Sequence, residues 1–100
     1  NKIKIRGKTM GIITNKHLEG LIDRINIVTK NPTTSWTKFK NGNIKPNIGN
    51  YHLDEAYGGV ALHQMVNEQG GVDDIFNSGY MTKRDLYNRL SAFLKGLGSY

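Results

Sequence analysis

The sequence has no cysteine, only two prolines and a single tryptophan among its 100 residues. Without cysteine, disulfide bonds and cysteine-ligated zinc sites are excluded. No apolar run approaches the roughly 18 residues needed to span a bilayer, and no signal-peptide region is recognisable. The sequence therefore predicts a soluble, cytoplasmic protein with no membrane partner.

A chain of 100 residues is expected to form one domain. Such a domain buries roughly two-thirds of the surface that its unfolded chain exposes, which leaves little room for a deep active site. A site at a subunit interface can be deeper, because residues of a second subunit enclose part of it.

The formal net charge of +6 is unevenly distributed along the chain. Residues 1–9 carry four basic and no acidic side chains, whereas residues 41–80 carry five acidic side chains and one basic one. A phosphate backbone would be repelled by that acidic stretch. Nucleic-acid binding is therefore a second choice. We interpret residues 1–9 as a basic N-terminal arm or a sequence left over from cloning, and residues 10–100 as a single domain.

Helices are predicted at both ends of this domain. The first spans about residues 15–30, because Leu18, Leu21, Ile22, Ile25 and Val28 recur at helical spacing. Thr14 or Asn15 can cap it, and Asn26 is expected on its polar side. Thr82 begins the last helix, with Asp85 completing a capping box. Its apolar stripe consists of Leu86, Leu90, Phe93, Leu94 and Leu97.

Between the helices the pattern favours hairpins. Residues 36–45 alternate around Asn41-Gly42, a strong hairpin-turn signal. Residues 50–57 and 60–66 also alternate, and Gly58-Gly59 can supply the positive φ of a tight turn. A helix over residues 60–68 is the competing interpretation, but the flanking glycine pairs favour strands. The predicted fold class is α+β, a small antiparallel sheet of hairpins packed against an N-terminal and a C-terminal helix.

Catalytic and metal sites find little support in the sequence. His52 and His63 would face each other across a hairpin, but with Asp54 they match no familiar zinc or iron spacing. The serines lack a nucleophile elbow, and the glycine pairs match no phosphate-binding loop. Asp54 and Glu55 would point to opposite faces of a strand, so they cannot form an acid–base pair. No enzyme, metal or cofactor is predicted.

Small-ligand binding suits the residues between 50 and 84 better. The tyrosines offer flat faces for a base, the amides read a base edge or ribose, and the two cations at the start of the last helix can meet a phosphate. The two glycines allow close approach to the backbone. The predicted ligand-binding residues are Asn50, Tyr51, His52, Tyr57, Gly58, Gly59, Gln64, Asn67, Lys83 and Arg84. Taken singly, each also has an ordinary structural explanation.

A set of motifs covering residues 10–98 resembles a family of small uncharacterised proteins of tailed bacteriophages. The matching segments are N-x-G-N-Y-H-L-x-x-A-Y-G-G-V-x-L from residue 47, V-N-E-x-G-G-V from 66, F-x-x-G-Y from 76 and T-K-R-D-L-Y from 82. Gln69 departs from the glycine more usual there. The resemblance implies a phage origin and no particular activity. By analogy, some small phage proteins form oligomers that trap the nucleotide signals of host defence.

We therefore expect a homo-oligomeric counter-defence protein, acting in the host cytoplasm, that sequesters a nucleotide-derived small molecule such as an immune signal. One alternative is a nucleic-acid-binding accessory protein that uses residues 1–9, Lys38, Lys40 and the last helix. Another is a protein–protein inhibitor of a host enzyme, anchored by Trp36 and Phe39. A nucleotide-cleaving enzyme is the third.

Overall fold

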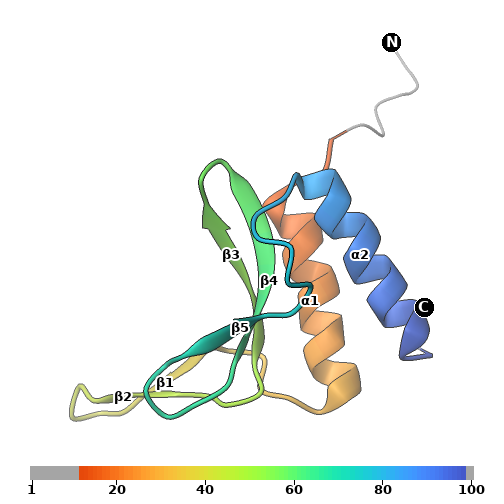
Figure 1. Ribbon diagram of the computed structural model, residues 1–100. Helices are drawn as coiled ribbons and strands as arrows, with labels where there is room; N and C mark the ends of the chain where they lie inside the picture. The colour runs from red at the N-terminus through yellow and green to blue at the C-terminus, as the bar shows by residue number, and fades with distance from the viewer. Residues whose placement is uncertain (1–11, 99–100) are drawn as a thin grey trace.

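Two helices cover one face of a three-stranded antiparallel sheet, and a separate two-stranded hairpin extends from one end of the molecule (Figure 1). The computed structural model describes residues 12–98, so the predicted N-terminal arm lies outside the described residues. In order, the elements are α1 (Asn15–Thr29), β1 (Trp36–Lys38), β2 (Ile44–Pro46), β3 (Tyr51–Ala56), β4 (Gly59–Met65), β5 (Val72–Asp74) and α2 (Lys83–Gly96). The predicted α+β architecture is confirmed. Over residues 12–98, no helix has the length and apolar character needed to cross a bilayer.

Both helices begin at the capping residues that the sequence contains. The Thr14 side chain accepts a hydrogen bond from the backbone N–H of His17, whose ring accepts one from the Thr14 N–H in return. Thr82 caps α2 by accepting from the backbone N–H of Asp85 at 3.1 Å. Each cap satisfies amide groups that a helix start leaves unpaired, so the polypeptide turns sharply into each helix.

The core lies between the helices and β4. Its buried side chains are Leu18, Ile22 and Ile25 from α1, Val60 and Leu62 from β4, and Leu86, Leu90 and Leu94 from α2. Burying one such side chain stabilises the fold by about 1.5–3 kcal/mol. The core therefore fixes the sheet against the helices, and it leaves the opposite face of the sheet for other roles.

The β3–β4 hairpin confirms the predicted strands and excludes the alternative helix over residues 60–68. Tyr57 and Gly58 form its turn with φ of 54° and 75°, positive φ at both central positions being characteristic of a type I′ turn. The prediction that Gly58 and Gly59 share the positive φ is therefore wrong by one position. Gly59 is needed for another reason, since a Cβ there would lie 3.0 Å from the Met81 carbonyl oxygen and the Tyr80 Cβ.

Asn26 corrects the prediction for α1, because it is fully buried and not on the polar side. Its side-chain amide donates to the Tyr51 carbonyl at 2.9 Å, and its side-chain carbonyl accepts from the Tyr51 N–H at 2.8 Å. The side chain thus occupies the hydrogen-bonding position of a neighbouring strand. This pair of bonds fixes the start of β3 on α1.

The predicted hairpin at residues 36–45 is present as β1 and β2, with Lys38 opposite Ile44. Its turn is longer than a two-residue Asn-Gly turn. The Phe39 carbonyl accepts from the Gly42 N–H, and the Phe39 N–H donates to the Asn43 carbonyl at 2.8 Å. Gly42 takes the positive φ of 89° that such a loop requires.

Candidate functional site

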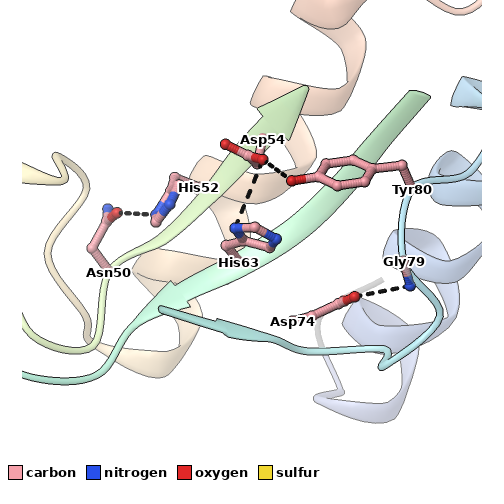
Figure 2. Close-up of polar contacts among 7 residues, drawn as sticks. All are labelled: Asn50, His52, Asp54, His63, Asp74, Gly79 and Tyr80. Carbon is pink, nitrogen blue, oxygen red and sulfur yellow. Dashed lines mark hydrogen bonds and ion pairs between the residues drawn. The ribbon is translucent and has the colours of Figure 1, made fainter. Parts of the chain in front are cut away.

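Polar side chains line the face of the sheet that the helices leave uncovered. Side chains alternate along a strand, so Tyr51 and Leu53 pack against the helix side while His52 points to the other face. His52 lies opposite His63 on β4, which in turn lies opposite Asp74 on β5. The predicted pairing of the two histidines across the hairpin is confirmed. Figure 2 shows His52, His63 and Asp74 with their polar neighbours.

His52 is held in one orientation by Asn50. The Asn50 side-chain N–H₂ donates to the Pro32 carbonyl at 2.8 Å, which leaves its Oδ1 to accept from the Ser35 hydroxyl and from His52 Nδ1, 3.1 Å away. The neutral ring therefore carries its proton on Nδ1 and keeps an acceptor at Nε2. Burial and the nearby His63 lower the pKa of His52 below its ordinary value of 6.5. His52 is thus a neutral hydrogen-bonding group near pH 7.

Tyr80 and Asp54 form the second half of this face. The Tyr80 hydroxyl donates to Asp54 Oδ2, and His63 Nδ1 lies 4.0 Å from the same oxygen (Figure 2). The bond to the carboxylate is the main reason that the pKa of the Tyr80 phenol is raised above its ordinary value. The side chain of His63 is only 14% exposed, so Tyr80 and Asp54 form the accessible side of this group.

Four aromatic rings form a row along this face that ends at the turn of the β3–β4 hairpin. The ring centroids are 6.0 Å apart for His52 and His63, 6.1 Å for His63 and Tyr80, and 5.7 Å for Tyr80 and Tyr57. Tyr57 ends the row at the turn, and it is 96% exposed. The row therefore presents an exposed phenol ring at its outer end, with three partly buried rings behind it.

A hollow of about 390 Å³ lies between this turn and the first turn of α2. It is lined by Glu55, Ala56, Gly58, Gly59, Val60 and Lys83. Nothing lies within 4 Å of the position that a Gly58 Cβ would take, so the backbone there is open to solvent. We call Tyr57, Gly58, Gly59, Lys83 and Glu55 together the tip site.

The structure brings some of the predicted ligand-binding residues together and separates others. Gly58, Gly59 and Lys83 line the same hollow, and Tyr57 precedes Gly58 in the turn without lining that hollow. His52 lies at the far end of the ring row. Arg84 lines a different hollow, of about 870 Å³, between α1 and the start of α2. The two predicted phosphate contacts therefore do not lie in one hollow.

The other four predicted residues have structural positions. Asn50 is 1% exposed and its amide is used internally, and Tyr51 packs edge-to-face on Phe93. The Gln64 amide donates to the Gly49 carbonyl. The Asn67 side chain accepts from the N–H groups of residues 69 and 71, which makes it a turn residue. These contacts explain the four residues without a ligand.

Four residues of this face and of the tip site are absent from the predicted ligand-binding set: Asp54, Glu55, His63 and Tyr80. The strand register places His63 beside His52, a signal that was available in the sequence. Tyr80 lies next to the sheet because the following residue, Met81, pairs with Val60 in an isolated β-bridge. No pattern in the sequence predicts this pairing. The chemistry of this face therefore depends on one long-range contact.

Within residues 12–98, no group of three histidine, aspartate or glutamate side chains is placed to hold a metal ion. Comparisons of the chain with protein families, with curated proteins and with solved structures found no match. The resemblance to phage proteins therefore stays a prediction from the sequence.

Proposed function

We propose that this protein binds a nucleotide-derived small molecule at the tip site. Support comes from the convergence of four residues from two distant segments, Tyr57, Gly58, Gly59 and Lys83, on one turn of the molecule. Gly58, Gly59 and Lys83 line one hollow, and the exposed Tyr57 ring stands beside Gly58 in the same turn. In the proposed complex the ligand spans the hollow and this ring. An aromatic face, an open backbone and a cation are the groups that contact a base, a sugar and a phosphate in small-ligand sites.

The exposed phenol of Tyr57 is the observation that carries this proposal. A non-glycine residue with positive φ is uncommon, and Asn, Asp or Gly normally occupies this place in a type I′ turn. Tyr57 has φ of 54° and is nevertheless 96% exposed, so its side chain contributes little burial to the fold. A strained backbone at an exposed ring indicates a role in binding.

The remaining groups define the chemistry of the ligand. Lys83 is the first residue of α2, where its amine and the helix amides both favour a phosphate. Glu55 lines the same hollow and can accept hydrogen bonds from the hydroxyls of a ribose. Tyr80, in edge-to-face contact with Tyr57, supports the stacking ring from behind. A monoanionic or dianionic nucleotide fits this arrangement better than a polyanion, because carboxylates lie on both sides of the turn.

Binding without turnover is the role we propose, and it requires no cofactor. If the chain is a phage protein, as its motifs suggest by resemblance, we propose that it captures a host immune signal in the cytoplasm and so protects the phage. A homo-oligomer would then present several tip sites and hold more ligand per particle.

The test is isothermal titration calorimetry with AMP, ADP-ribose and cyclic di-GMP as separate probes. We expect at least one to bind, and Tyr57→Ala to weaken that binding by about 5- to 150-fold, because stacking of a base on an aromatic ring contributes about 1–3 kcal/mol. Tyr57→Phe should retain most of the affinity.

Lysine variants provide a matched comparison. Lys83→Gln should weaken the binding of the same probe, whereas Lys95→Gln, at the other end of α2, should leave it unchanged. Equal affinity of the wild type and Tyr57→Ala, or the absence of binding by all three probes, would overturn the proposal.

A further inference from the structure

The β1–β2 hairpin, residues 36–46, is a surface that the proposed function does not use; we call it the arm. It forms a two-stranded sheet of its own and projects at one end of the molecule (Figure 1). Three large apolar side chains on it are exposed: Trp36 by 44%, Phe39 by 47% and Ile44 by 60%. An isolated two-stranded hairpin is marginal in water, so such an arm gains from being covered.

The base of the arm is nevertheless well fixed. The Asn47 side chain accepts from the Thr37 hydroxyl at 2.8 Å and donates to the Thr34 carbonyl at 3.0 Å. A Cβ at Gly70 would lie 2.8 Å from the Trp36 ring, so this ring packs directly on the backbone of the loop before β5. The arm is therefore a positioned element, anchored beside residues 66–74.

The arm is basic on both faces. In the observed register Trp36, Lys38 and Ile44 share one face, and Thr37 and Lys45 share the other. Lys40 lies in its turn, and residues 31–53 contain no acidic side chain. Its chemistry is apolar surface bordered by positive charge.

Residues 66–74, which we call the acidic flank, have the complementary chemistry. They carry Glu68, Asp73 and Asp74 and no basic side chain. Val66 and Val72 are 38% and 41% exposed. Within the described residues, β5 pairs with β4 on one side only, so no strand covers its other edge. The flank thus offers apolar surface, negative charge and an open strand edge.

We propose that two copies of this chain associate reciprocally, with the arm of each copy lying on the acidic flank of the other. Charge complementarity and the exposed apolar side chains on both surfaces favour this occupant. The two surfaces adjoin within one chain through Trp36 and Gly70, so a two-fold axis nearby forms both contacts at once and closes the assembly. This inference does not depend on the tip site.

The first test measures the mass of the full chain by light scattering and native mass spectrometry across a wide range of protein concentration. We expect a concentration-dependent dimer, or a larger assembly built from it. Because Trp36 is the only tryptophan, its emission should shift to the blue as the assembly forms. Ile44→Glu should weaken association by about tenfold or more, since it places a charge in an apolar contact.

A charge swap makes the test specific. Lys38→Glu and Asp73→Lys should each weaken association, and the double variant should recover much of it because attraction is restored. Lys30→Glu, at the C-terminal end of α1, is the matched control and should have no effect. Circular dichroism verifies that each variant keeps the fold.

A monomer at all concentrations would overturn this inference, and so would an assembly that Ile44→Glu and the charge variants leave unchanged. Titration with single-stranded dT₂₀ tests the rival occupant. If the chain stays monomeric and dT₂₀ quenches Trp36 in a salt-dependent manner, the arm is a nucleic-acid surface and the proposed dimer is wrong.

Discussion

The helix-covered part of the molecule and the arm use apolar residues in opposite ways. Leu62, Leu86 and Leu90 are completely buried, whereas Trp36, Phe39 and Ile44 on the arm are 44–60% exposed. The first group contributes its free energy to folding, and the second keeps its apolar area available for a partner. Substitutions in the two regions should therefore change different measured quantities.

The largest expected effect is on the core. Leu90→Ala should lower the free energy of unfolding by about 2–5 kcal/mol, because it opens a cavity among fully buried side chains. Ile44→Ala, on the arm, should change it by no more than about 0.5 kcal/mol. Urea denaturation of both variants at one low protein concentration measures the contrast. A large loss in Ile44→Ala would show that the arm belongs to the core.

The bonds between Asn26 and Tyr51 should come next. Asn26→Ala leaves the part-buried N–H and carbonyl of Tyr51 without partners, and an unpaired buried group costs about 1–3 kcal/mol. We expect a loss of about 2–4 kcal/mol in urea denaturation. Asn43→Ala, in the exposed turn of the arm, is the control and should have little effect. Equal stability of the two variants would show that Asn26 does not stabilise the contact between α1 and β3.

The third effect concerns pH. The pKa of His52 is lowered in the folded state, so the unfolded chain binds more protons as the pH falls below about 6.5. This residue should make the fold progressively less stable from that pH down to its own folded pKa. The dependence of stability on pH should be smaller in the His52→Gln variant. Thermal unfolding from pH 7.5 to 5 tests this, and a slope unchanged by the substitution would contradict it.

The smallest expected change in the free energy of unfolding is at Tyr57, and there the substitution stabilises the fold. Tyr57→Asn relieves a positive φ that tyrosine tolerates poorly, and it should raise the free energy of unfolding by about 0.5 kcal/mol. The same variant should lose affinity for the calorimetric probe. Lower stability in Tyr57→Asn would mean that this ring supports the fold and is not a binding group.

Local patterns account for the parts of the fold that were predicted correctly. The helical spacing of Leu86, Leu90 and Leu94 and the cap at Thr82 are properties of neighbouring residues, so they are visible in the sequence. The alternation of residues 50–66 gave the hairpin and the pairing of His52 with His63.

The misassigned residues depend on long-range contacts. Asn26 and Asn50 have polar side chains that are typical of surfaces and turns, yet each is buried because it bonds to backbone from a distant segment. Tyr80 joins the site only because the segment before α2 pairs with β4 through the bridge between Met81 and Val60. Lys83 and Arg84 are neighbours in the sequence, but successive side chains of a helix point in different directions, so these two line different hollows.

The most direct test of the central claim is native mass spectrometry of the wild type and Tyr57→Ala after incubation with a nucleotide-metabolite extract from phage-infected bacteria. Capture at the tip site predicts a discrete small-molecule adduct on the wild type that is lost or much reduced in Tyr57→Ala. Subunit number is read from the same spectrum, so a failure of ligand capture is distinguished from a failure of the arm-mediated assembly. A wild-type spectrum without any adduct, or an equal adduct on both proteins, would contradict the account.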